Sequence, residues 1–484
     1  MIRATLRDSL IYGFASLLSK GLAIFLLPIY TRVLSVRDYG AYDLLLTLGA
    51  LANLIVAMEV SQGLARHWVD LKSPTDRSRL ASTALWFTVC MYFAFLIFGL
   101  SFSELLSDFL FSSQEFLPSL RFGLVFIAVN GVYYLFLNQF RWELRSGSYA
   151  VASLAYALGV LILSLLFCFV LDMGLEGVML GQMLAALLAS CFSWYLLRHS
   201  FGWFFDFSLL RKMLIFSAPL VPAGLATFVS LYMNRVALHH FSTLDELGLF
   251  GVASRLAGVM GIMMLGVQSA LMPLVYQHYN EPTTPEKVAK LFGWFVALAW
   301  FVCLFLILGA KWILTLFATS EYSRAAGLVA YLAPALLLSQ MYIFAPGIGI
   351  RKKTYIQLLL TMFAAGTSLL ANQLLVPEWG GTGAAVATLL SALVFFVSWV
   401  CVSQRLYPIP YAWRAVGGLT VGFCVCAGLG LWLDTDVGSI WVSAAAKLML
   451  VVFFLALVFL LGLVSAAELR SVRFWITQRF GRPG

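Results

Sequence analysis

The chain has 484 residues, of which 62% are hydrophobic and only 11% are charged, with a formal net charge of +9. A water-soluble protein of this size carries about 25% charged residues, so the composition excludes an ordinary soluble protein. Apolar stretches long enough to cross ~30 Å of hydrocarbon recur from one end of the chain to the other. The sequence therefore predicts a polytopic membrane protein in which no segment is left over for a soluble domain.

The predicted fold class is an all-α integral membrane protein with about 14 transmembrane helices. The first apolar segment is too long for a signal-peptide core and carries Lys20 near its middle, so we expect a transmembrane helix there and no cleaved signal peptide. The predicted segments, in chain order, are 9–34, 42–65, 80–103, 117–140, 149–171, 174–197, 212–241, 247–275, 288–310, 325–350, 354–375, 380–403, 412–433 and 440–464.

The basic residues indicate how these segments are oriented. With the N-terminus in the cytoplasm, most of the 31 Lys and Arg residues fall in cytoplasmic loops, as the positive-inside rule requires. An even number of spans then places both termini in the cytoplasm, which agrees with the basic C-terminal tail. This distribution accounts for the net positive charge, so we expect no nucleic-acid partner.

A faint internal repeat relates the second segment to the eighth. Asp38-Tyr39-Gly40 opens the second segment, and Asp245-Glu246-Leu247-Gly248 opens the eighth. A six-helix unit returns the chain to its starting side, so two copies would be parallel lobes, an arrangement typical of transporters that work by alternating access. The predicted divisions are residues 1–205 for the first lobe, 206–405 for the second, and 406–484 for two further helices and a basic cytoplasmic tail.

Two cations lie deepest in the predicted membrane interior. Lys20 is near the middle of the first segment, and Arg255 is about a third of the way into the eighth. Ionisable side chains within a bilayer usually face a cavity or a partner, so we expect both to line a central cavity. A cationic cavity suits an anionic cargo such as a phosphate or an acidic sugar.

Four further side chains are candidates for the same cavity. Glu59, Gln62 and Arg66 would share one face of a helix at positions i, i+3 and i+7, and Arg235 lies toward the outer end of the seventh segment. Arg66 and Arg235 are close to helix ends, where snorkelling or a loop contact is an equal alternative. Glu59 could instead neutralise Lys20 or Arg66.

Signals for enzyme, metal and redox chemistry are missing from the sequence. The seven cysteines lie in apolar stretches without a C-x-x-C pair, and the five histidines cluster near predicted interfaces. The phosphate-binding loop G-x-x-x-x-G-K-[ST], the zinc motif H-E-x-x-H and the nucleophile motif G-x-S-x-G are all absent. We therefore expect no metal site and no cofactor.

Two neighbouring runs of sequence carry a family resemblance. They are Lys20–Ser35 (KGLAIFLLPIYTRVLS) and Asp38–Tyr42 (DYGAY), which together contain the pattern P-I-Y-T-R-x-L-S-x-x-D-Y-G. These runs resemble the start of Wzx-type lipid-linked oligosaccharide flippases, which belong to the multidrug/oligosaccharidyl-lipid/polysaccharide superfamily. The resemblance extends more loosely over the whole chain through its length, helix number and repeat.

The resemblance implies a function in O-antigen, lipopolysaccharide or related polysaccharide biosynthesis. Such proteins move an undecaprenyl-diphosphate-linked oligosaccharide unit across the bacterial inner membrane. They are thought to use an ion gradient, of H⁺ or Na⁺, and a V-shaped cavity that is often cationic when the sugar unit is acidic. A polysaccharide polymerase and chain-length machinery would be partners, and we expect a monomer in contact with membrane lipid. The family fixes no universal set of functional residues to transfer to this chain.

Other functions stay open at this stage. A lipid II flippase would also favour cations, because its cargo carries a diphosphate. A cation-coupled multidrug exporter should favour acidic or aromatic cavity residues, and Glu59 is the one interior acid that the sequence suggests. A polymerase or ligase of the same pathway tends to have a large periplasmic loop, whereas the longest external connection here has about 14 residues. A purely structural scaffold would not need polar residues within its helices.

Overall fold

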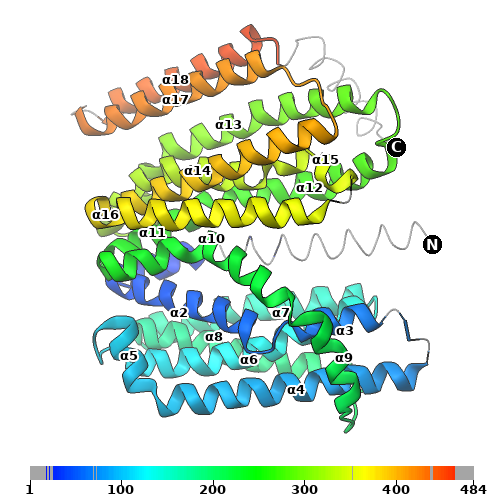
Figure 1. The fold of residues 1–484 in the computed structure, drawn as a ribbon. Coiled ribbons are helices and arrows are strands. Elements are labelled where there is room, and N and C mark those ends of the chain that lie inside the picture. Colours follow the sequence, from blue (N-terminus) through cyan, green and yellow to red (C-terminus); the bar gives the residue numbers. More distant parts are fainter. Residues whose placement is uncertain are drawn as a thin grey trace, which may run out of the picture. The chain divides into compact units, whose positions relative to one another are not determined.

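The computed structural model describes residues 18, 21 and 26–463, except residues 69, 72, 352 and 437–439. Within these limits every regular element is a helix (Figure 1). Ten of the helices are long and apolar enough to cross a membrane, or up to twelve if each of two bent pairs forms one span. The predicted all-α membrane fold is confirmed, whereas the predicted number of fourteen spans is not.

The chain divides into two compact units. Unit 1 takes in the described residues up to Val252 together with Phe317–Tyr322 and Ser368–Ala384. Unit 2 comprises Ala253–Leu316, Ser323–Thr367 and the described residues from Ala385 onward. The divisions at residues 205 and 405 that the sequence suggested stay predictions.

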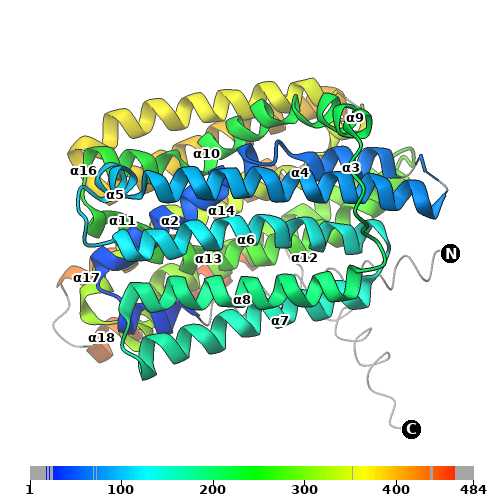
Figure 2. The same cartoon turned by 90° about the horizontal axis from the view of Figure 1, so that it is seen from below.

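Unit 1 is a bundle in which α6 packs against α4 and α8, and α7 packs against α8 (Figure 2). Its helices are α2 (Val36–Ile55), α3 (Val60–Trp68), α4 (Pro74–Ser101), α5 (Ser103–Phe111), α6 (Leu117–Trp142), α7 (Ser146–Leu165) with the π-helical η1 (Leu166–Val170), α8 (Gly174–Leu197), α9 (Phe207–Ser217), α10 (Leu220–Phe241) and the first part of α11 (Leu244–Ala257).

The outward side chains of unit 1 are those of a surface in contact with lipid. On α4, Phe93, Ile97 and Phe98 are each more than half exposed, whereas the polar Thr88 is buried. A water-soluble bundle shows the reverse pattern, with apolar side chains inside and polar ones outside. The exposed face of α4 therefore suits hydrocarbon.

Most residues of the remaining helices belong to unit 2. These helices are α12 (Val259–His278), α13 (Thr284–Phe317), α14 (Ala325–Gln340), α15 (Gly347–Ile350), α16 (Thr354–Leu406), α17 (Trp413–Asp436) and α18 (Ile440–Leu460), with the 3₁₀ turns η2 (Ser320–Arg324) and η3 (Met341–Phe344). The parts of α13, η2 and α16 that lie within Phe317–Tyr322 and Ser368–Ala384 belong to unit 1. The indole of Trp300 on α13 stacks on Phe423 of α17 and donates a hydrogen bond to Thr420. On α18, the buried Lys447 donates from its Nζ to the backbone carbonyl of Leu308, at 3.0 Å.

The long element α16 is two antiparallel helices. Gly380 has φ +51°, a left-handed conformation that reverses the chain and that glycine adopts without a steric penalty. Ser391 donates a hydrogen bond to the carbonyl of Ala364, 27 residues earlier. A straight helix would separate these two residues by about 40 Å, so the chain must fold back between them. The two predicted segments 354–375 and 380–403 correspond to these two helices.

Candidate transport site

Two neighbouring spans of unit 1 are bent by the same angle. The axis turns by 45° between α2 and α3 and by 45° between α9 and α10. Helix α2 packs against α10, and α3 packs against α9. The two bends therefore lie next to each other. Broken helices within a membrane are tolerated where protein or water satisfies the freed backbone groups, and such breaks frequently line transport sites.

The bend between α2 and α3 arises from two consecutive left-handed residues. Met58 has φ +48° and Glu59 has φ +52°, and neither is glycine. Each such residue stores about 1–3 kcal/mol of backbone strain, which the surrounding packing must offset. The sequence predicted one continuous helix here, with Glu59, Gln62 and Arg66 on a single face. That prediction is wrong at Glu59, because the helix is interrupted at this residue.

Polar side chains gather around this bend. The side chain of Gln62 is hydrogen-bonded to Glu59. One turn before the bend, Asn53 accepts a hydrogen bond of 2.8 Å from the hydroxyl of Tyr92 on α4. Gly131 of α6 leaves the space that the Tyr92 ring occupies, since a Cβ there would overlap the ring. A carboxylate, two amides and a phenol from α4 thus lie around the bend.

Arg66 lies beyond the bend, near the end of α3. Its Nη1 is 2.9 Å from Oδ2 of Asp70, and the two side chains are 54% and 58% exposed. An exposed pair of this kind contributes about 0–1 kcal/mol to stability. This position agrees with the alternative that Arg66 makes a contact near the end of its helix and does not line a cavity.

The second bent span contributes Arg235. Its Nε lies 2.6 Å from Oδ2 of Asp43 on α2; the Asp43 side chain is buried, and that of Arg235 is 15% exposed. The guanidinium also lies over the rings of Tyr232 and Phe250, at 5.2 and 5.5 Å. Each carboxylate and guanidinium within a bilayer requires such a partner. The sequence analysis missed Asp43, although an aspartate within an apolar segment was a signal that could have identified it.

The other two predicted cavity residues are differently placed. Arg255 is half-buried on α11, next to the interruption at Gly258 between α11 and α12. It belongs to unit 2, whereas Asp43, Arg235 and the α2–α3 bend belong to unit 1. Lys20 lies outside the described residues. A role for either cation in a transport passage stays a prediction.

The tyrosines of the P-I-Y-T-R and D-Y-G-A-Y runs form a buried network in unit 1. The hydroxyl of Tyr30 is 3.0 Å from Ser164 of α7. Gln182 of α8 donates a hydrogen bond of 2.7 Å to the hydroxyl of Tyr42. Tyr322 donates to the carbonyl oxygens of Leu34 and Ser35, each at 2.9 Å, just before α2 begins. These contacts explain why the motif contains tyrosines, since they fix the position of α2.

Helices α2 and α11, whose first residues are related by the internal repeat, cross at two glycines. We call this contact the glycine crossing. A Cβ on Gly40 of α2 would overlap the carbonyl oxygen of Leu244, and a Cβ on Gly248 of α11 would overlap the carbonyl oxygen of Val36. In each case the obstructing carbonyl precedes the other glycine by four residues, so the contacts are reciprocal. The helices α2 and α11 therefore cross with their backbones in contact, which only glycine at both positions allows.

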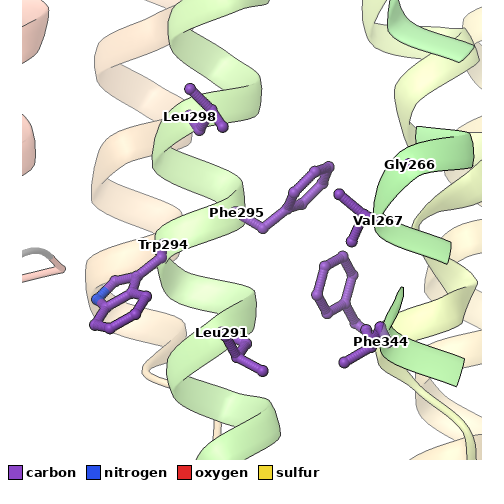
Figure 3. Close-up of a pocket in the computed structure, with 8 residues that line it drawn as sticks. Gly266, Val267, Leu291, Trp294, Phe295, Leu298 and Phe344 are labelled. Atoms are coloured by element: carbon purple, nitrogen blue, oxygen red, sulfur yellow. The ribbon is translucent and has the colours of Figure 1, made fainter. Parts of the chain in front are cut away.

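Unit 2 contains an apolar pocket of about 490 Å³, within the range of small-molecule sites (Figure 3). In Figure 3 the ring of Phe295 on α13 points toward Val267 of α12 and Phe344. The lining residues are Gly266, Val267, Leu271, Leu291, Trp294, Phe295, Leu298 and Phe344. Such a lining offers contacts for hydrocarbon and few hydrogen-bonding partners for a sugar.

A metal centre is not formed by the described residues, since no three His, Cys, Asp or Glu side chains among them are grouped to hold an ion. All seven cysteines carry free thiols.

Solved structures with the same fold are transporters. The fold matches that of the lipid II flippase MurJ in an inward closed conformation, with a TM-score of 0.70, 12% identity, and coverage of 92% of this chain and 98% of that one. It also matches an inward-facing multidrug resistance transporter of the MATE family in the MOP superfamily, with a TM-score of 0.62, 18% identity, and coverage of 81% and 95%. At these identities the similarity establishes the fold.

One relative is similar in sequence, and a family profile identifies the family. Protein 1 of the Lsg locus of Haemophilus influenzae is 24% identical to this chain over 286 residues. The match covers 57% of this chain and 67% of that protein. The profile of the family described as "Polysaccharide biosynthesis protein" matches residues 5–279, more than half of the chain. The chain belongs to this polysaccharide biosynthesis protein family and has the fold of the flippases and exporters of the MOP superfamily.

Proposed function

We propose that this protein flips an undecaprenyl-diphosphate-linked oligosaccharide repeat unit across a bacterial inner membrane for O-antigen or related polysaccharide biosynthesis. The observation that carries the proposal is the family match over residues 5–279 on a fold of membrane transporters. A polysaccharide family needs its lipid-linked intermediates on the outer side of the membrane, and the fold is of a kind that moves molecules between the two sides.

The physical problem supports a passage built from polar groups. Moving a diphosphate and several sugars through hydrocarbon would break hydrogen bonds worth several kcal/mol for each polar group. A passage lined by side chains such as those at the α2–α3 bend replaces some of these hydrogen bonds. The lipid tail needs no such replacement and can stay in hydrocarbon.

The charges of the candidate residues favour an anionic cargo. Lys20, Arg235 and Arg255 would supply positive charge for a diphosphate or an acidic sugar. The buried Asp43 neutralises the charge of Arg235. The net positive charge of the candidate residues is therefore smaller than the sequence suggested. In this proposal the lobes rock by alternating access, driven by H⁺ or Na⁺, and a polymerase with its chain-length machinery receives the product.

Two alternatives within the superfamily have specific support. A lipid II flippase shares the fold and a diphosphate cargo. A multidrug exporter shares the fold as well, and the pair of interior acids Asp43 and Glu59 removes part of the argument against an organic-cation cargo. The family match favours the polysaccharide function over both.

The test is deletion of the gene in its native bacterium, with lipid-linked oligosaccharide on each leaflet and surface polysaccharide measured together. We expect the lipid-linked unit to accumulate on the cytoplasmic leaflet and surface polysaccharide to be lost, both restored by the wild-type gene. Normal surface polysaccharide with altered cell-wall precursors would favour lipid II, and altered drug susceptibility would favour an exporter.

A further inference from the structure

The connection between α8 and α9 presents a run of aromatic side chains outward. Trp203 is 89% exposed, and Phe204, Phe205 and Phe207 are between 50% and 73% exposed. These four exposed aromatic side chains are close in sequence and form an apolar patch. An exposed patch of this kind marks an interaction surface. We call residues 198–207, with these four side chains, the aromatic loop.

The aromatic loop is fastened to α4 at two points. The backbone N–H of Gly202 donates to Oγ of the buried Ser82 at 2.8 Å. The N–H of Asp206 donates to Oγ1 of the buried Thr83 at 3.2 Å. Figure 2 shows the connection passing from α8 across α4 to α9. The residues between these two attachments are therefore held on the outer surface of α4.

The first aromatic residue has a fixed orientation as well. The indole of Trp203 stacks on Trp86 of α4, with ring centroids 4.8 Å apart. Trp86 in turn donates from Nε1 to the carbonyl of Gly202, at 3.2 Å. Trp203 thus contacts Trp86, while nearly all of its surface is left for another surface.

The composition of α4 gives the depth of these attachments in a membrane. Helix α4 has 28 residues and is about 42 Å long, whereas the hydrocarbon layer is about 30 Å thick. Its first ten residues, 74–83, are mainly polar, and an apolar run begins at Ala84. Ser82 and Thr83 therefore lie where headgroups meet hydrocarbon, so the aromatic loop lies at that level.

The charges around the aromatic loop are positive. The guanidinium of Arg79 lies over the ring of Phe204, 5.8 Å from its centroid. The exposed basic residues Arg198, Arg211 and Lys212 flank the loop in sequence. The carboxylate of Asp206 is engaged as the N-cap of α9, accepting from the N–H groups of residues 208 and 209. Aromatic rings at the interface beside basic side chains are the combination that binds anionic lipid.

We propose that the aromatic loop is a docking site for the anionic phospholipids of the bilayer, with Trp203, Phe204 and Phe205 at the level of the headgroups and Arg79 and Arg211 on lipid phosphates. This site would fix the junction between α8 and the bent α9–α10 span to the membrane surface. The proposal concerns bulk lipid and does not depend on the cargo, so it can fail while the flippase function stands.

The first test uses tryptophan fluorescence of the full-length protein in vesicles of phosphatidylcholine and phosphatidylglycerol. The emission of Trp203 is obtained as the difference between wild type and Trp203→Phe. The control is the emission of Trp379, which is 54% exposed, obtained in the same way from Trp379→Phe. We expect the Trp203 component to be quenched by lipid brominated near the headgroup end of its chains and to be unaffected by aqueous iodide. Quenching by iodide alone, or by neither agent because another protein surface covers the loop, would overturn the proposal.

The second test measures selectivity for anionic lipid. The enrichment of fluorescent phosphatidylglycerol over phosphatidylcholine around the protein is compared between wild type, Arg79→Gln and Arg211→Gln. Each substitution should lower the enrichment by about fivefold, the factor associated with one basic residue at an anionic surface. Unchanged enrichment in both variants, with the folded protein confirmed by its thermal transition, would contradict the assignment.

Discussion

Arg235 of α10 and Asp43 of α2 form a buried ion pair that joins the two bent spans of unit 1, with Nε 2.6 Å from Oδ2. The pair connects a residue near the start of the first bent span with one near the end of the second. When α10 moves relative to α2, the ion pair must therefore either break or keep its contact by a shift of both side chains.

Removing one partner of this pair should be more damaging than removing both. Asp43→Asn or Arg235→Gln leaves an uncompensated buried charge, and breaking such a pair costs about 3–5 kcal/mol. We expect each single variant to lower the thermal unfolding temperature in detergent and surface polysaccharide export. The double variant Asp43→Asn/Arg235→Gln should recover stability, because no lone charge remains. A loss in the double variant equal to the sum of the two single losses would show that the two residues act separately.

The glycine crossing of α2 and α11 should not tolerate a side chain. Gly40→Ala or Gly248→Ala places a methyl group on the opposing carbonyl oxygen, so the helices must separate. We expect lower stability and reduced export for both variants. Gly147→Ala is the matched control, since its Cβ would meet no atom within 4 Å. The outcome that conflicts with a close crossing is wild-type unfolding temperature and export for Gly40→Ala.

The bend at Met58 should respond to backbone preference. Its φ of +48° suits glycine, and Met58→Gly should stabilise the folded protein by about 1 kcal/mol if the local strain is relieved. Met58→Ile should destabilise it, because a β-branched residue is disfavoured at positive φ. Chemical unfolding in detergent measures both effects. The reverse order, with isoleucine more stable than glycine, would exclude a left-handed conformation at this residue.

Lys447 gives a way to separate a structural from a transport role in α18. Its Nζ is buried against the carbonyl of Leu308. Keeping an ammonium group out of water is costly, and Lys447→Met removes that cost while retaining most of the side-chain volume. We therefore expect Lys447→Met to keep or raise the unfolding temperature and to keep export. Normal stability with export lost would instead place Lys447 in the transport machinery.

The membrane fold followed from the sequence because apolar length alone determines a span. The segments 354–375 and 380–403 were correctly separated, since Pro377 and the glycines near 380 interrupt the apolar pattern. The bend at Met58 and Glu59 was missed because neither residue favours the left-handed conformation by itself; tertiary packing imposes it. Asp43 could have been noted as an acid within an apolar segment. Its pairing with Arg235 could not be predicted, because the two residues lie 192 positions apart and no local pattern reveals that contact.

The central claim is that this protein moves a lipid-linked oligosaccharide from one leaflet to the other. The most direct measurement is transbilayer movement of a purified undecaprenyl-diphosphate oligosaccharide in proteoliposomes, followed by its accessibility to a membrane-impermeant glycosidase, with and without an ion gradient. The account predicts that wild-type protein makes the inner-leaflet glycan accessible, and that Asp43→Asn does so more slowly. Glycan that stays inaccessible with active, folded wild-type protein, while lipid II or an organic cation crosses, would contradict it.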